Sequence, residues 1–237
     1  MKIDLFIPCF VDQLYPQSAV NMVHVLRKMD CEIRYNSKQT CCAQAAYNAG
    51  FWDEAKAVAI KFYKDFENAD RIVSPSASCV AFLKQDLPKL LSDTIDADTL
   101  QAFTSKIHEF TEFLVTFCPI ERLNPTLKGR AFYHDSCAAV HFFKNTEAPR
   151  KLLSRVQQLE LIESNEAAVC CGFGGSFSVK FEPISLAMAA DRVELCDKLG
   201  VNYLISADSS CLMQLQGYIE KKAYNIKCMH IADVLAG

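Results

Sequence analysis

The sequence has no long apolar run and no strong excess of either charge. Its 25 Lys and Arg residues against 28 Asp and Glu residues leave a net charge of -3, so it lacks the basic character that nucleic-acid or membrane-surface binding needs. No stretch approaches the roughly 18–20 apolar residues of a membrane span. The first residues contain an apolar run interrupted by Asp4 and no small-residue cleavage site, which predicts a strand and not a signal peptide. We therefore expect a cytoplasmic protein with no transmembrane segment and no nucleic-acid partner.

Several familiar cofactor motifs are also missing. The sequence has no C-x-x-C pair and no C-x₂-C-x₂-C-x₃-C-P run of the ferredoxin type. The glycine-rich stretch CCGFGGSF at 170–177 contains only a G-x-G fragment, and no Lys-Ser/Thr of a P-loop follows it. Any ferredoxin-type chain of clusters must therefore belong to a partner.

Cysteine, in contrast, is abundant, with 12 residues in a chain of 237. A disulfide framework is not expected without a secretory signal, because the cytosol keeps thiols reduced. The excess therefore indicates metal or redox chemistry.

The cysteines reveal an internal duplication. In each half, one cysteine ends a short β-rich run, a vicinal pair follows, and another cysteine follows a strand, a serine and a turn. The offsets are nearly constant, since Cys137 lies 128 residues after Cys9, Cys170 lies 129 after Cys41, and Cys211 lies 132 after Cys79. The repeated pattern contains Cys9, Cys41, Cys42 and Cys79 in the first half and Cys137, Cys170, Cys171 and Cys211 in the second.

Strands and helices alternate in both halves, which predicts an α/β fold with parallel sheets in two tandem, pseudo-symmetric βαβ-type repeats. Residues 52–66, for example, carry apolar side chains with a helical period. The amphipathic segment 96–117 is expected to form one long central helix that joins the halves. We place the first cysteine-rich repeat at 1–95, the connecting helix and linker at 96–129, and the second repeat at 130–237.

Each cysteine position follows the C-terminal end of a predicted strand, the edge at which open α/β sheets gather ligands. Four thiolates can therefore converge in each half, where they suit either a tetrahedral zinc ion or a [4Fe–4S] cluster. The vicinal pairs favour a cluster, because structural zinc sites prefer C-x₂₋₄-C spacing. Gly172, Gly174 and Gly175 would let the backbone bend around a cluster and direct N–H groups at its sulfides.

The doubled pattern resembles the cysteine-rich CCG domain of heterodisulfide reductases and of the iron–sulfur subunits of glycolate oxidases. It is more similar to the lactate-utilization protein A family. The segments that carry this resemblance are QTCCAQAAYNAGF at 39–51, SPSASC at 74–79, YHDSC at 133–137, CCGFGGSFSVKF at 170–181, SADSSCLMQLQG at 206–217 and MHIADVL at 229–235.

The resemblance implies a non-autonomous oxidoreductase subunit with one iron–sulfur cluster, of the [4Fe–4S] type, in each repeat. It would transfer electrons in a cytoplasmic complex that oxidises L-lactate to pyruvate, with two partner subunits, one of which carries ferredoxin-type clusters. The sequence shows no flavin or nicotinamide motif, so we do not expect the chain to turn over lactate alone. The alternatives are a glycolate- or disulfide-linked oxidoreductase subunit and a zinc-stabilised scaffold protein.

The sequence departs from the CCG pattern in two ways. The first half reads Cys41-Cys42-Ala43, so the two sites are expected to differ in how closely the backbone approaches. Ser76 and Asp208 replace the first cysteine of a terminal C-x-x-C. This leaves four thiolates in each site, which favours a [4Fe–4S] cluster over a five-thiolate type; oxygen ligation by Ser76 or Asp208 is an alternative.

The remaining cysteines and histidines are interpreted as structural. Cys118, Cys196 and Cys228 are expected to be small buried side chains, whereas Cys31 opens a strand and could also face the first site. His134 is interpreted as a packed or hydrogen-bonded residue, and His230 as a helix cap or surface residue.

Overall fold

Two four-stranded sheets form the centre of the protein, which we describe from a computed structural model in which residues 1–164 and 169–237 are described. The first sheet has the order β2-β1-β3-β4 and contains β1 (Lys2–Leu5), β2 (Glu32–Tyr35), β3 (Ile72–Ser74) and β4 (Ile107–Glu109). The second has the order β6-β5-β7-β8 and contains β5 (Thr126–Tyr133), β6 (Gln157–Ile162), β7 (Tyr203–Ser206) and β8 (Lys227–His230). All neighbouring strands are parallel, and the two orders correspond strand by strand. The predicted α/β fold with two similar parallel halves is confirmed.

Helices connect the strands, as parallel pairing requires. Those of the first half are α1 (Cys9–Leu14), α2 (Pro16–Lys28), α3 (Gln44–Asn48), α4 (Trp52–Phe66), α5 (Ala77–Gln85), α6 (Leu87–Leu91), α7 (Ala97–Thr104) and α8 (Phe110–Phe117). A short 3₁₀ helix, η1 (Ile120–Arg122), lies in the link to the second half. The helices of that half are α9 (Cys137–His141), α10 (Glu147–Leu153), α11 (Ser176–Lys180), α12 (Glu182–Lys198), α13 (Ser209–Lys222) and α14 (Ile231–Ala236). Within the described ranges, no helix combines the length and apolarity needed to cross a membrane.

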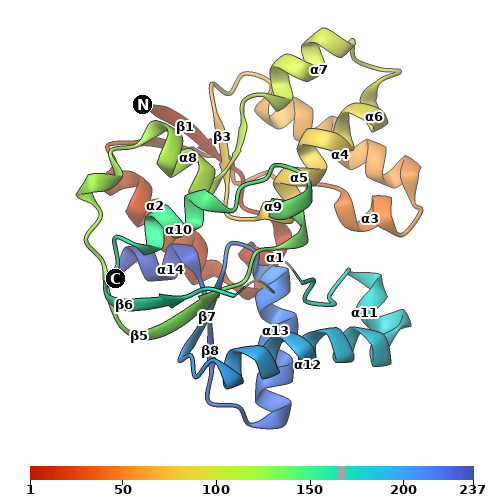
Figure 1. Cartoon of the computed structure of the whole chain (residues 1–237). Coiled ribbons are helices and arrows are strands. Elements are labelled where there is room, and N and C mark those ends of the chain that lie inside the picture. Colours follow the sequence, from red (N-terminus) through yellow and green to blue (C-terminus); the bar gives the residue numbers. More distant parts are fainter. Residues whose placement is uncertain (165–168) are drawn as a thin grey trace.

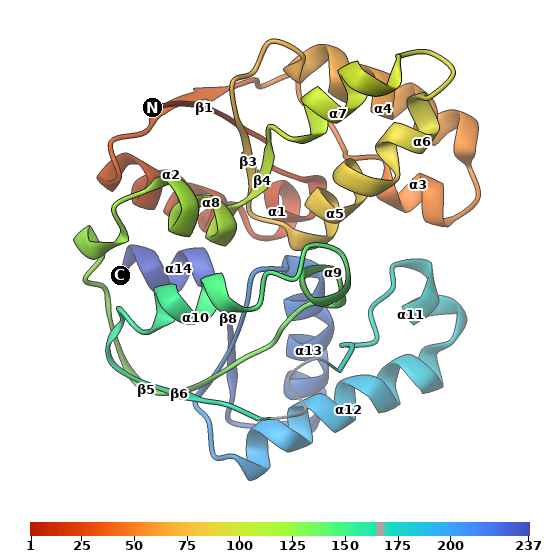
Figure 2. The same ribbon diagram turned by 45° about the horizontal axis from the view of Figure 1, so that its top comes forward.

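The helices that lie between the two sheets join the halves (Figure 1, Figure 2). Helix α2 of the first half packs on α14 of the second, and α10 of the second half packs on α8 of the first. These contacts repeat each other, because α2 and α10 come after the first strand of each half and α8 and α14 after the last. A second reciprocal set, α5 with α9 and α1 with α13, lies near the C-terminal ends of the strands. The two halves are therefore arranged with pseudo-twofold symmetry.

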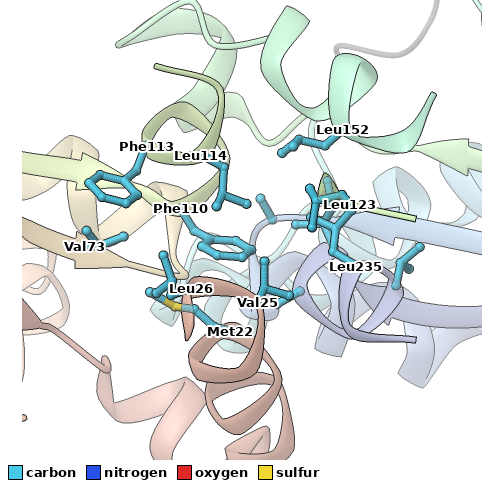
Figure 3. Close-up of a cluster of buried hydrophobic side chains, with 14 of the residues drawn as sticks. Met22, Val25, Leu26, Val73, Phe110, Phe113, Leu114, Leu123, Leu152 and Leu235 are labelled. Atoms are coloured by element: carbon cyan, nitrogen blue, oxygen red, sulfur yellow. The ribbon is translucent and has the colours of Figure 1, made fainter. Parts of the chain in front are cut away.

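One apolar core runs through this helical layer (Figure 3). Leu26 of α2, Phe110 of α8, Leu152 of α10 and Leu235 of α14 are all at most 1% exposed. Complete burial of a side chain of this size stabilises the fold by roughly 1.5–3 kcal/mol. The two halves share this core, so they do not fold around separate interiors alone.

The opposite face of each sheet has a core of its own. Adjacent residues of a strand point to opposite faces, so Val73 enters the shared core whereas Ile72 contacts the outer core formed with α4 to α7. In the second half Ala131 faces the shared core, and Phe132 faces the outer core formed with α12 and α13. Both sheets are thus covered on both faces, as is usual for parallel sheets.

The single long helix predicted over 96–117 is wrong. This segment forms α7, then strand β4, then α8. β4 pairs with β3 and completes the first sheet, as β8 completes the second. The Glu109 side chain accepts the backbone N–H groups of Thr111 at 2.9 Å and Glu112 at 3.3 Å and so starts α8. A strand of three residues is too short to break the helical pattern of apolar residues around it, which explains the error.

Candidate metal sites

Three chain segments bring cysteines together at the C-terminal edge of each sheet. In the first half they are the start of α1, the loop between β2 and α3, and the first turn of α5. In the second half they are the start of α9, the loop before α11, and the first turn of α13. All twelve cysteines are free. The first site contains Cys9, Cys41, Cys42 and Cys79, and the second contains Cys137, Cys170, Cys171 and Cys211.

The sulfur atoms of the first site lie in contact. Cys9 Sγ is 3.8 Å from Cys41 Sγ, and Cys42 Sγ is 3.2 Å from Cys79 Sγ. Cys42 and Cys79 are buried, whereas Cys9 is exposed. The structure therefore brings all four predicted cysteines of this half together, with one side of the group open to solvent.

The second site has the same connectivity. The Cys137 thiol donates to the Cys170 sulfur, and Cys171 interacts with both Cys170 and Cys211. Cys171 and Cys211 are buried, and Cys137 is exposed. A ring nitrogen of His134 and the Sγ atoms of Cys171 and Cys211 all lie within 4.8 Å of one another.

Each group of thiols favours one thiolate at its centre. Donation from the thiols of Cys42 and Cys9 lowers the pKa of Cys41, and donation from Cys137 and Cys171 lowers the pKa of Cys170. The pKa values of the donor thiols are raised, because their protons are held in these hydrogen bonds and burial disfavours the charged forms. The donors are Cys9, Cys42, Cys137 and Cys171. A bound cation would release the remaining protons.

The backbone supports the central sulfur in the same way in both sites. The N–H of Ala43 donates to Cys41 Sγ at 3.4 Å, and the N–H of Gly172 donates to Cys170 Sγ at 3.4 Å. Both residues are left-handed, with φ of 83° at Ala43 and 84° at Gly172. The difference in backbone approach expected from Ala43 is therefore absent at this position, although the left-handed conformation costs an alanine roughly 1–2 kcal/mol.

The glycine is required at position 172 for a different reason. A Cβ there would lie 2.5 Å from the Ser185 carbonyl oxygen and 2.9 Å from Met188 Cβ. Ser185 also donates its hydroxyl to the Gly172 carbonyl at 2.8 Å. Gly172 thus allows close packing of the cysteine loop on α12. Gly174 and Gly175 both have positive φ, but a Cβ at Gly175 would meet nothing within 4 Å.

Ser76 and Asp208 act as helix N-caps. Ser76 Oγ accepts the N–H of Cys79 at 3.4 Å and starts α5. Asp208 Oδ1 accepts the N–H of Ser210 at 3.1 Å and starts α13. Asp208 Oδ2 also accepts the N–H of Ser78, from the other half, at 2.8 Å. These bonds orient the helices that carry Cys79 and Cys211.

The two sites adjoin each other across the interface between the halves. The rings of Phe10, next to Cys9, and Phe173, close to Cys171, meet edge to face with centroids 5.5 Å apart. The N–H of Ala77 donates to the Ala207 carbonyl at 3.4 Å.

His230 caps α14 by accepting the N–H of Ala232, and its other ring nitrogen lies 2.9 Å from the Pro75 carbonyl oxygen. Its predicted capping role is confirmed.

The other cysteines lie outside both sites. Cys31 precedes β2 and interacts with Cys118, which lowers the pKa of Cys31 to about 7. This pair is at the N-terminal edge of the first sheet, so Cys31 does not face the first site. Of the three cysteines expected to be buried, Cys196 in α12 is buried, whereas Cys118 and Cys228 are only partly buried.

His134, interpreted from the sequence as a packed or hydrogen-bonded residue, is packed and has no hydrogen-bond partner among the described residues. It follows β5 directly, is 0% exposed and lies against the second site. Burial, followed by the positive charge of Arg192, lowers its pKa to about 4, so its imidazole is neutral near pH 7 and its lone pair is available. The only signal in the sequence was its position three residues before Cys137.

Residues 3–84 and 131–216 match the CCG family of cysteine-rich domains. The fold and the paired thiol groups thus define a protein with two cysteine-rich domains in one chain. A crystal structure of a hypothetical protein from Helicobacter pylori is similar over 100% of this chain and 49% of its own, with a TM-score of 0.60. At 13% identity this likeness concerns the fold alone.

Several relatives, among them two from Geobacillus and Halalkalibacterium, match the chain over almost its whole length. Lactate utilization protein A of Geobacillus sp. (strain WCH70) is 40% identical over 235 residues, with 99% of each chain covered. Lactate utilization protein A of Halalkalibacterium halodurans is 37% identical, with 99% of this chain and 96% of the relative covered. The chain belongs to the lactate utilization protein A family.

Proposed function

We propose that each thiol group holds an iron–sulfur cluster of the [4Fe–4S] type and that the chain is an electron-transfer subunit. The observation that carries this proposal is the duplicated convergence of four free cysteines, with Cys42 Sγ and Cys79 Sγ only 3.2 Å apart. Four soft donors at one edge, with the vicinal cysteines both contributing, suit a multi-iron centre. When bound, such a cluster accepts and releases single electrons.

The protein would contribute the ligands and tune their charge. Cys9, Cys41, Cys42 and Cys79 would hold one cluster, and Cys137, Cys170, Cys171 and Cys211 the other. The backbone N–H groups of Ala43 and Gly172 already donate to ligand sulfurs, and hydrogen bonds of this kind raise the reduction potential of a cluster by stabilising negative charge. Contact between Phe10 and Phe173 brings the two sites close, which suits transfer between them.

The relatives support a role in lactate utilization, because they carry that name over the full length of the chain. We propose that the subunit belongs to a cytoplasmic complex that oxidises L-lactate to pyruvate. Two partner subunits would complete this complex, one of them with ferredoxin-type clusters. Glycolate or a disulfide is the alternative substrate.

A zinc-stabilised scaffold remains the second candidate, and one observation favours it. His134, Cys171 and Cys211 offer one nitrogen and two sulfurs within 4.8 Å, a donor set that zinc also accepts.

Anaerobic purification separates the two candidates. Brown protein with broad visible absorption, acid-labile sulfide and about four irons per site would support clusters. Colourless protein with stoichiometric zinc and no iron, prepared without oxygen, would contradict the redox function. Growth of a deletion strain on L-lactate tests the substrate, since undiminished growth would contradict the lactate assignment.

A further inference from the structure

A buried imidazole without a hydrogen bond lies at the second site. His134 is 0% exposed, and neither of its ring nitrogens has a hydrogen-bond partner among residues 1–164 and 169–237. Leaving a buried polar group unpaired costs free energy, so such groups in folded proteins call for a specific explanation, such as an ion that binds there.

The position of the ring provides that explanation. One ring nitrogen lies within 4.8 Å of both Cys171 Sγ and Cys211 Sγ. Nitrogen and sulfur ligands of one metal ion lie roughly 3.5 Å apart, given bond lengths near 2.0–2.3 Å. The side chain therefore needs only a small adjustment to share a metal with these two sulfurs.

The first half has no such nitrogen at the corresponding place. Phe6 lies three residues before Cys9, as His134 lies three residues before Cys137. The Phe6 ring packs edge to face on Phe62, with centroids 4.9 Å apart, in an apolar core. The first site thus has a hydrocarbon ring where the second has an imidazole.

A second position near the sites also differs between the two halves. Helix α4 buries residues 55, 59, 62 and 66, and α12 buries 185, 189, 192 and 196 with the same spacing. Arg192 therefore takes the place of Phe62. It is 1% exposed, and its guanidinium lies over the Phe132 ring at 5.5 Å. The Phe6–Phe62 pair of one half corresponds to a His134–Arg192 pair in the other.

We propose that His134 is a metal ligand of the second site, together with Cys171 and Cys211, so that the two sites hold chemically different centres. The first site has four thiolates, one for each iron of a [4Fe–4S] cluster. The second has a fifth donor, an imidazole, so its centre departs from the one-thiolate-per-iron arrangement. This proposal rests on the proposed function, because it requires that the second site binds a metal. Histidine ligation raises the reduction potential of iron–sulfur centres, so the second centre would be the more oxidising of the two.

The test uses the full chain with histidine labelled with ¹⁵N, reconstituted anaerobically with iron and sulfide. Pulsed EPR of the reduced protein detects coupling between the unpaired spin and a ligating histidine nitrogen. We expect this coupling in the wild type and its loss in His134→Phe, which copies the first half, together with a shift of one centre to lower potential. His108→Phe is the matched control, because His108 in β4 also has a buried, unpartnered ring nitrogen within the described structure but lies away from both sites.

The outcomes distinguish this proposal from the proposed function. Iron at both sites with no histidine coupling, or a coupling that survives in His134→Phe, overturns the histidine ligand and leaves the electron-transfer function intact. A wild type that binds no iron contradicts the function instead. In that case Co²⁺ binding tests the ligand. The visible absorption bands of bound Co²⁺ should change in His134→Phe and not in His108→Phe. Unchanged bands in His134→Phe would overturn the proposal.

Thermal unfolding separates ligation from packing. Phenylalanine removes an unpaired buried imidazole, so metal-free His134→Phe should unfold at a temperature no lower than the wild type. The added metal should then raise the unfolding temperature of the wild type more than that of the variant. The result would show only a packing role for His134 if the metal-free variant unfolds at a lower temperature than the wild type and metal raises both unfolding temperatures equally.

Discussion

Ser78 of the first half donates its backbone N–H to the Asp208 carboxylate of the second half at 2.8 Å. The same carboxylate caps α13 through Ser210. Asp208 thus joins the interface between the halves to the two helices that carry Cys79 and Cys211. Asp208 stands where the CCG pattern has a cysteine, and its side chain organises the site through hydrogen bonds within the protein.

Asp208→Ala should lower the free energy of unfolding of the metal-free protein by about 2–4 kcal/mol, because a cap and a buried charge-assisted bond are lost together. Denaturant unfolding measures this change. Asp96→Ala is the control, since Asp96 caps the exposed start of α7 by accepting the N–H of Thr99, a bond within the first half. Equal losses in the two variants would show that the bond between the halves contributes nothing.

Cys170→Ser should remove one site and spare the other. Cys170 is the central thiol of the second site, so its loss should reduce bound iron to about half, with the first cluster retained. Cys41→Ser should have the mirrored effect. Iron and sulfide analysis after anaerobic reconstitution provides the measurement. Cys196→Ala, which changes a buried cysteine outside both sites, should keep its full iron content; unchanged iron in Cys170→Ser would disprove the ligand set.

Gly172→Ala and Ala43→Gly should have opposite effects on stability. The alanine at 172 would meet the Ser185 carbonyl at 2.5 Å and occupy a left-handed φ, so we expect a loss of about 1–3 kcal/mol or more. Glycine at 43 relieves the left-handed strain at φ 83° and should leave stability unchanged or slightly increased. Chemical denaturation of the metal-free variants provides the comparison, and an Ala43→Gly variant that loses as much as Gly172→Ala would contradict it.

The ionisation of Glu109 should lower the free energy of unfolding as pH rises. It is 1% exposed, and burial raises its pKa from 4.5 to about 7. A carboxyl with a raised pKa binds its proton more tightly in the folded state than in the unfolded state. Its contribution is therefore greatest below pH 4.5 and is lost as pH rises through 7. The free energy of unfolding should fall by at most about 3 kcal/mol over this range, at 1.36 kcal/mol per pKa unit.

Glu109→Gln tests this pH dependence, because an amide cannot ionise but can still accept the N–H of Thr111. The variant should show a flatter dependence of unfolding free energy between pH 5 and 8 than the wild type, measured by urea titration at each pH. Asn145 of the second half donates to Glu109 Oε2 at 3.1 Å. The protonation of Glu109 therefore affects a hydrogen bond between the two halves. Identical slopes in the two proteins would show that Glu109 ionises normally.

Local patterns predicted most of the fold correctly. The helix at 52–66 is α4, and the repeated cysteines follow strand ends in both halves. β4 escaped prediction because three residues carry too little periodicity of their own, and only pairing with β3 defines them. Nothing local distinguished Ala43 as left-handed either, since that conformation follows from the path that the loop takes around Cys41.

The duplication, the parallel α/β class and the eight cysteines that converge could be predicted from the sequence, because spacing and strand direction are local properties of the chain. The residues that surround these cysteines became apparent only in the folded protein. Asp208 contacts Ser78 across 130 positions, and a ring nitrogen of His134 lies within 4.8 Å of Cys211 Sγ in the half that has His134 in place of Phe6. Such contacts depend on how distant segments pack around the shared core, and no spacing in the chain encodes them.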